Sequence, residues 1–339
     1  MQARILGIAG HLPDRLETNA DLARQHPDWD MSQIGEKTGI LARRIAAAGE
    51  TACDLGCRAG EKLLARGLAP LAEIDYVLFA TQTPDHFLPA NACLLHRRLG
   101  LAPHAGAVDV SSGCAGFVLA LQLAQGLIGG GSARNVLVVT ADTYSKLVHP
   151  DDRTVRSLFG DAAAATLVGA AEGPGIGQFV TGTDGSGASR LVVPAGGFRL
   201  PHSAATCLPS VDPQGGVRSQ EHLFMDGQAV FAFTLNTVPR AIHTLLQKTG
   251  TGGEQIDWYV FHQANKYMLE NLAKCSRIPA EKMIYHLAEV GNTVASSIPL
   301  AIEAACQSGR IRAAQRLILV GFGVGYSWAA CDVTWTAPP

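Results

Sequence analysis

The chain has 339 residues, a length that favours two domains or one large duplicated core. Hydrophobic residues make up 47% of it and charged residues 17%, so a large buried core is easily built. The net charge of −2 gives no sign of a nucleic-acid partner. No apolar stretch approaches the ~20 residues of a membrane-spanning helix. We therefore expect a cytoplasmic protein without membrane insertion.

The first half of the chain alternates apolar strands with helices. Residues 1–15 predict a first strand ending at a proline turn rather than a signal peptide. Further strands are expected at 74–83 and 134–143, with a helix around 90–99. Between them, VDVSSGCAGFVLALQLAQGLI (108–128) predicts a strand, a tight turn and a buried helix.

The second half repeats this pattern at a constant offset of 182 residues. IDYVLFATQT resembles IDWYVFHQAN (256–265), and RNVLVVTADT resembles RLILVGFGVG (316–325). The same offset places VDVSSGCAGF on VGNTVASSIP (290–299), so Cys114 falls on Ser296. Near-continuous apolar strands are buried on both faces, as in layered α/β proteins. The sequence therefore predicts a duplicated α/β fold.

Two boundaries follow from this pattern. A division near AAEGPGIG separates an N-terminal half, 1–175, from a C-terminal half, 176–339. A Gly-, Pro- and Ser-rich stretch, 194–221, predicts a long loop. Loops of this length are uncommon unless functional or disordered, so it is either a surface excursion or a cover for the substrate.

Cys114 lies where the buried helix of 108–128 is expected to begin. A helix N-terminus carries unpaired N–H groups and a partial positive charge, which push a thiol toward the nucleophilic thiolate. The alternative is a buried structural cysteine, a common core residue. No C-x-x-C pair or Cys/His cluster indicates a metal site.

Two further residues follow apolar strands in the second half. His262 stands in FHQAN and Asn292 in EVGNTVASS, and each alone has a structural interpretation. The glycine-rich turn GFGVGYSW (321–328) lacks phosphate-loop motifs but can aim backbone N–H groups at an oxyanion. Cys, His and Asn together indicate covalent thiol chemistry. Acyl transfer ending in carbon–carbon bond formation fits, whereas papain-like hydrolysis lacks its C-G-[SA]-C-[WY] signature.

SSGCAGF, HQAN, GNT with SSIP after it, and GFGVGYSW resemble the motifs of β-ketoacyl-acyl-carrier-protein synthase III. The resemblance covers essentially the whole chain, in the family's order. It implies the thiolase-like, duplicated five-layer α/β/α/β/α fold, a homodimer, and no metal or tightly bound cofactor. The substrates it implies are an acyl-coenzyme A and a malonyl unit, carried by an acyl carrier protein or by coenzyme A.

The resemblance also implies the catalytic roles. Cys114 would take the acyl group from a thioester. His262 and Asn292 would donate hydrogen bonds to the malonyl thioester oxygen and so stabilise the enolate left by decarboxylation. The backbone N–H groups of Cys114 and Val324 would form the oxyanion hole, and Phe322 would contact substrate.

The chain departs from the family mainly where substrates are recognised. Gln33 and Lys37 take the places of a tryptophan and an arginine that bind coenzyme A, and Trp29 lies out of register. Arg153 matches a second such arginine, and Gln228 stands where an asparagine contacts the pantetheine arm. Other matched positions are Leu88 for a phenylalanine that limits acyl length, and Ala232, Tyr267 and Lys274 at the carrier-protein surface.

These departures leave several functions open. We hypothesise that the enzyme serves a dedicated pathway, such as a secondary metabolite or a surface-lipid or polysaccharide modification, with neutral drift as the alternative. An acyltransferase to oxygen or nitrogen on the same fold is a second interpretation. A non-catalytic dimer partner is a third, although the intact Cys114 argues against it.

Overall fold

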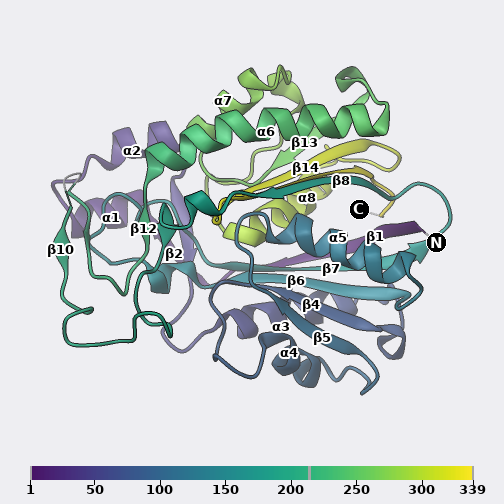
Figure 1. Ribbon diagram of the computed structural model, residues 1–339, viewed down its shortest axis with the longest axis horizontal. Coiled ribbons are helices and arrows are strands. Elements are labelled where there is room, and N and C mark those ends of the chain that lie inside the picture. Colours follow the sequence, from purple (N-terminus) through teal and green to yellow (C-terminus); the bar gives the residue numbers. More distant parts are fainter. Residues whose placement is uncertain (1, 213–214, 338–339) are drawn as a thin grey trace.

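The computed structural model describes residues 2–212 and 215–337, which form two large β-sheets with helices between and outside them, and smaller two-stranded pairs (Figure 1). The first sheet has the order β1-β7-β6-β4-β5 and the second has the order β13-β14-β15-β8. Their strands are β1 (Gln2–His11), β4 (Tyr76–Ala80), β5 (Gly106–Val110), β6 (Asn135–Asp142), β7 (Ala162–Ala171), β8 (Ile176–Thr183), β13 (Trp258–Phe261), β14 (Arg316–Gly323) and β15 (Ser327–Thr334).

The helices complete five layers. α5 (Gly116–Gly129) and α8 (Ser297–Gln307) lie between the two sheets and contact both. α3 (Ala52–Leu64) and α4 (Asn91–Leu99) cover the outer face of the first sheet, whereas α6 (Gly227–Thr249) and α7 (Lys266–Cys275) cover the second. A helix packed between two sheets must be apolar nearly all round, which explains the Leu- and Ala-rich sequence of α5.

The two sheets share one topology, which confirms the duplicated α/β fold. β6 runs parallel to β4 and antiparallel to β7, just as β14 runs parallel to β13 and antiparallel to β15. The second sheet has no full counterpart of β5 among the described residues; an isolated parallel bridge between Tyr259 and Met283 stands there. The offset that places VDVSSGCAGF on VGNTVASSIP therefore does not give a second strand at 290–292, because Asn292 forms only an isolated bridge with Phe159.

The predicted boundary falls in the connection between the two sheets. β7 ends at Ala171 in the first sheet and β8 begins at Ile176 in the second. The predicted long loop is closed at its base by β9 (Leu191–Val192) and β12 (Phe224–Met225), which pair with each other. It carries a short hairpin of β10 (Ser210–Val211) and β11 (Val217–Arg218), whose tip, 213–214, lies outside the described residues.

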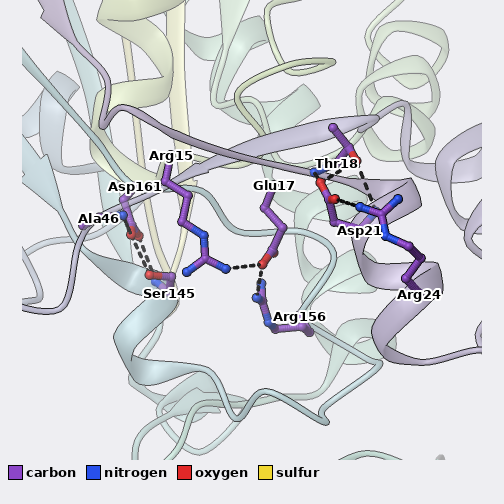
Figure 2. Close-up of polar contacts among 9 residues, drawn as sticks. All are labelled: Arg15, Glu17, Thr18, Asp21, Arg24, Ala46, Ser145, Arg156 and Asp161. Atoms are coloured by element: carbon purple, nitrogen blue, oxygen red, sulfur yellow. Dashed lines mark hydrogen bonds and ion pairs between the residues drawn. The ribbon is translucent and has the colours of Figure 1, made fainter.

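A small unit of β2 (Arg15–Thr18), β3 (Ala42–Ile45), α1 (Asn19–Gln25) and α2 (Met31–Thr38) packs beside the layers. Buried Glu17 binds Arg156 at 2.6 Å and Arg15 at 3.3 Å (Figure 2). Buried Asp161 accepts hydrogen bonds from the backbone of Ala46 and from the Ser145 hydroxyl, at 2.8 and 2.5 Å. These contacts fix the segment that carries Arg153.

Within the described residues, six single turns of 3₁₀ helix connect these elements. They are η1 (Leu71–Glu73), η2 (Tyr144–Leu147), η3 (Gly185–Gly187), η4 (Gly253–Gln255), η5 (Ala280–Lys282) and η6 (Val294–Ser296). η6 leads directly into the central helix α8, so it occupies the position that the turn before α5 has in the first half.

Candidate active site

Cys114 lies in the turn between β5 and α5, as the sequence predicts. Its side chain is buried and packs against the glycine-rich end of β14. A Cβ atom added to Gly323 would lie 2.9 Å from both Cβ and Sγ of Cys114, closer than side chains tolerate. Gly323 therefore lets the backbone of the second half approach the sulfur of the first.

The three predicted catalytic residues meet in one cavity of about 90 Å³. Cys114, His262 and Asn292 line it together with Phe322. Cys114 comes from the first half, whereas His262 follows β13 and Asn292 precedes η6 in the second half. The cavity therefore lies at the junction of the two halves.

The protonation of Cys114 differs from the sequence-based expectation. Complete burial and the nearby Asp142 carboxylate raise the pKa of the Cys114 thiol to about 12. Backbone hydrogen bonds from Val324 and from Cys114 itself act in the opposite direction. The expectation of a low-pKa thiol was wrong because it counted the helix terminus, a local feature, and not the loss of water around the sulfur.

His262 is neutral in the cavity. Burial lowers its pKa to about 4, although a backbone hydrogen bond to Val294 opposes the shift. Its Nδ1 lies 2.8 Å from the hydroxyl of Ser297, and its ring packs edge-on against Phe322 with centroids 5.5 Å apart. These contacts hold the imidazole in one orientation.

Asn292 is fixed through its backbone and one side-chain atom. Its N–H donates to the Leu158 carbonyl at 2.8 Å, and its carbonyl accepts from Gly160 at 3.0 Å. Its Oδ1 accepts the backbone N–H of Val294 at 3.0 Å. Because an asparagine amide has two donors on Nδ2, these N–H groups are available to a ligand in the cavity.

A buried carboxyl group near Cys114 was missed by the sequence analysis. Asp142, the last residue of β6, receives hydrogen bonds on Oδ1 from the backbone of Gln82 at 2.8 Å and from the hydroxyls of Thr81 and Thr83 at 3.3 Å each. Its Oδ2 has no hydrogen-bond partner among the residues that the structure describes. Burial raises the pKa of Asp142 to about 7. No sequence motif marks such a residue.

The aromatic wall of the cavity was also missed. Tyr144 lines the cavity, packs against Phe159 at a centroid distance of 4.8 Å, and donates its hydroxyl to Gln82 at 3.1 Å. Phe159 lines the same cavity. A single Tyr or Phe in a connecting segment carries no signal in the sequence that separates a cavity wall from ordinary core packing.

An outer cavity of about 700 Å³ adjoins the inner one. Its lining includes Lys37, Arg153 and Gln228, the three residues predicted to contact coenzyme A. The two cavities share five lining residues: Leu158, Met225, Gly227, Asn265 and Met268. A channel of this kind suits a long, flexible substrate arm with its reactive end at Cys114 and its charged end at the surface.

Trp29, Lys37 and Leu88, which the sequence analysis compared with the family, lie in different surroundings. Trp29 is buried and stacks on His26 at 3.9 Å, so it does not line the outer cavity. Lys37 instead lies over the ring of Tyr267, with Nζ 5.8 Å from the centroid. Leu88 is 83% exposed and lines neither cavity, so within its own chain it does not limit acyl length.

Over residues 2–212 and 215–337, no group of three or more His, Cys, Asp or Glu side chains is arranged to hold a metal ion. None of the helices in these ranges is long and apolar enough to cross a membrane.

The fold belongs to the thiolase-like class. It has five layers and two sheets of one topology, and the site lies near the starts of the two central helices. Residues 108–185 match the family 3-oxoacyl-[acyl-carrier-protein] synthase III, and residues 246–335 match the C-terminal part of the same family. The chain belongs to this family.

Individual relatives agree over nearly the full length. The β-ketoacyl-[acyl-carrier-protein] synthase III of Rhodopirellula baltica is 35% identical over 98% of each chain. A crystal structure of a 3-oxoacyl-(acyl-carrier-protein) synthase III is 50% identical, with a TM-score of 0.97 over 99% of this chain and 100% of that one. A priming β-ketosynthase of a polyketide pathway is 31% identical, with a TM-score of 0.88 over 100% and 97%.

Proposed function

We propose that the chain catalyses the β-ketoacyl synthase III reaction, in which an acyl group is carried on Cys114 and then condensed with a malonyl thioester. The observation that carries this proposal is the meeting of Cys114, His262 and Asn292 in one buried cavity at the inner end of a channel. A nucleophile alone would support acyl transfer, whereas decarboxylation also needs donors placed at the malonyl oxygen.

In the first step the Cys114 sulfur attacks the acyl thioester. The negative charge on the carbonyl oxygen is stabilised by the backbone N–H groups of Cys114 and Val324, which already hydrogen-bond toward the sulfur. Removal of one such donor typically costs about 2.7–4 kcal/mol of barrier. Val324 replaces a glycine without loss, because only its backbone is used.

In the second step the malonyl thioester loses carbon dioxide and the resulting enolate attacks the acyl-cysteine. The Nδ2 of Asn292 donates to the thioester oxygen, since its Oδ1 is already engaged by Val294. His262 donates to the same oxygen when its Nε2 carries the proton. Both residues lie in a cavity that excludes bulk water, which strengthens these hydrogen bonds.

The channel indicates where the coenzyme A and pantetheine parts of the substrates would bind. Lys37 and Arg153 place positive charge in the lining of the outer cavity, where the phosphates of an acyl-coenzyme A would bind. Gln228 and Asn265 offer side-chain amides along the pantetheine path. The malonyl unit arrives on coenzyme A or on an acyl carrier protein, for which exposed Lys274 is one contact.

A homodimer completes the proposed enzyme. β5 is an edge strand of the first sheet, and its Val108 is 41% exposed. Phe87, next to Leu88, is 76% exposed and contacts Phe198, also exposed, at 5.5 Å. Unpaired strand edges and contiguous exposed apolar side chains are typical of interfaces. A role for Leu88 in acyl selection requires such a second copy.

Intact-protein mass spectrometry after incubation with a panel of acyl-coenzyme A thioesters tests the proposal. Wild type and a Cys306→Ala control should gain one acyl mass, and Cys114→Ala should gain none. Added malonyl carrier protein should then discharge the adduct as a β-keto product. Discharge only to an alcohol or amine would support the acyltransferase interpretation, and no adduct from any coenzyme A or carrier-protein donor would contradict the proposal.

The same panel tests the dedicated-pathway hypothesis. A longer or branched donor that labels Cys114 faster than acetyl-coenzyme A does would support a specialised role. A preference for acetyl-coenzyme A over every longer donor would contradict it.

A further inference from the structure

Ser297 is a buried residue at the first position of α8. Its hydroxyl oxygen makes three contacts. It lies 2.8 Å from Nδ1 of His262, it donates to the Val294 carbonyl at 2.8 Å, and it accepts the backbone N–H of Gln263 at 3.3 Å. Among the described residues, this hydroxyl is the only side-chain group at hydrogen-bond distance from the imidazole of His262.

These contacts determine the direction of the bond to His262. A hydroxyl group has one proton to donate. The Val294 carbonyl can only accept and the Gln263 N–H can only donate, so the hydroxyl proton points to Val294. The remaining contact must then be donated by the ring, from Nδ1. The Val294 backbone acts on the ring in the same sense, since its hydrogen bond favours a protonated imidazole.

The acceptor carbonyl is itself held in place. Val294 has a φ of 52°, in the left-handed region that a β-branched residue rarely adopts. Its N–H donates to Oδ1 of Asn292 at 3.0 Å. One residue thus orients the amide of Asn292 through its N–H and the hydroxyl of Ser297 through its carbonyl.

We propose, building on the function proposed above, that Ser297 is a positioning residue that keeps the proton of resting His262 on Nδ1. Nε2 then presents a lone pair to the cavity that His262 lines. As the S–H bond of Cys114 breaks, Nε2 accepts the proton and the sulfur bonds to the acyl carbon. When the carbon–sulfur bond to coenzyme A breaks, the proton passes to the departing sulfur.

The arrangement has a consequence for the second step. To donate from Nε2 to the enolate oxygen, His262 must change tautomer, which requires the Ser297 hydroxyl to turn from Val294 to Nδ1. The resting enzyme is therefore set for acylation, and decarboxylation of malonyl thioester before acylation is disfavoured.

The test compares Ser297→Ala with Ser296→Ala, a matched control whose hydroxyl is equally buried but bonds to Thr140 at 2.9 Å. Two rates are measured on each full-length variant: acylation of Cys114 by an acyl-coenzyme A, and carbon dioxide release from malonyl thioester without an acyl donor. We expect Ser297→Ala to acylate at least tenfold more slowly while its decarboxylation is unchanged or faster. Ser296→Ala should leave the ratio of the two rates unchanged.

A loss of decarboxylation alone, or an equal loss in both rates, would overturn the proposal. Nitrogen-15 NMR of the histidine rings gives a readout independent of activity, with His262→Ala identifying the signal. Wild type should show a protonated Nδ1, and Ser297→Ala should shift the population toward a protonated Nε2. A protonated Nε2 in resting wild type would contradict the proposal, whereas absence of any acyl adduct in wild type would contradict the proposed function instead.

Discussion

The two central helices begin differently, although they occupy equivalent places in the two halves. α5 follows a regular strand, β5, and a short turn that holds Cys114. α8 follows no strand of the second sheet; an irregular segment and the single turn η6 precede it. The irregular segment before α8 carries Asn292, whereas the turn between β5 and α5 carries the nucleophile, Cys114. The duplicated scaffold thus brings two different kinds of chemistry to one cavity.

In the second half, the serine that contacts the site is one residue beyond the position that aligns with Cys114. Ser296, which the 182-residue offset matches to Cys114, turns its hydroxyl to Thr140 of the first sheet and does not line the cavity. Ser297, the next residue, bonds to His262. Equivalence in sequence register therefore does not give equivalence in the site, because the backbone before α8 is wound differently from that before α5.

Making the start of α5 resemble the start of α8 should have the largest effect. In Cys114→Ser the hydroxyl is a much weaker nucleophile, so acyl-adduct formation should fall by at least about 10³-fold. Intact mass against time measures this rate. The reverse change, Ser296→Cys, should add a thiol that iodoacetamide does not reach in the folded protein. Acylation of Cys114→Ser within tenfold of wild type would break the comparison.

Gly323→Ala should push the end of β14 away from the sulfur of Cys114. The added methyl group would collide with Cβ and Sγ of Cys114 at 2.9 Å. A misplacement of the reacting sulfur by about 1 Å costs on the order of 10²-fold in rate. Gly126→Ala on α5, which meets open space, is the matched control and should keep the wild-type acylation rate. Equal rates in the two variants would show that the close approach is not needed.

Arg153→Ala should weaken binding in the outer cavity without changing the chemistry. Loss of a charge-assisted hydrogen bond to phosphate costs about 1.5–3 kcal/mol, so KM for an acyl-coenzyme A should rise roughly tenfold or more. With an acyl-pantetheine donor, which lacks the nucleotide, KM should stay as in wild type. Arg240→Ala, at an exposed position of α6, is the control. An equal rise in KM for both donors would contradict the predicted contact.

Asp142→Asn should have the smallest effect, and it depends on pH. The pKa of Asp142 is raised to about 7, so its charge opposes the Cys114 thiolate mainly above that pH. Alkylation of Cys114 by iodoacetamide should be a few-fold faster in the variant at pH 8.5, on the order of 1 kcal/mol, and nearly equal at pH 6. A difference that does not change with pH would contradict this account.

The raised pKa of Asp142 also makes the free energy of unfolding depend on pH. A carboxyl group whose pKa is higher in the folded state than in the unfolded state binds its proton more tightly when folded. The free energy of unfolding of wild type should therefore fall relative to Asp142→Asn as pH rises from about 4 to about 7. Denaturant titrations at the two pH values measure it, and a free energy of unfolding of wild type that rises relative to that of Asp142→Asn would contradict the raised pKa.

The sequence predicted the fold well because periodicity and repetition are visible in it. The positions of β4, β6, β13 and β14 followed from apolar runs at one offset. The absence of a β5 counterpart among the described residues could not be predicted, because the repeat aligns residues 290–292 with the strand at 108–110 and only tertiary packing shows that they do not pair in the second sheet.

The site residues also include some that the sequence predicted and some that it did not. Cys114, His262 and Asn292 carry recognisable motifs, and the structure brings them together. Asp142 has no motif, and Ser297 lies in SSIP without an implied role, since the importance of both comes from contacts with residues distant in the chain. The pKa of Cys114 was expected to be low because a helix terminus is a local feature, whereas burial is a property of the whole fold.

The most direct test of the division between the halves is to measure both half-reactions in Asn292→Ala. We predict that the variant forms the Cys114 acyl adduct at close to the wild-type rate. After malonyl carrier protein is added, the adduct should persist, with β-keto product forming about 10²–10³-fold more slowly. Failure to form the adduct, or its discharge to product at the wild-type rate, would contradict the account.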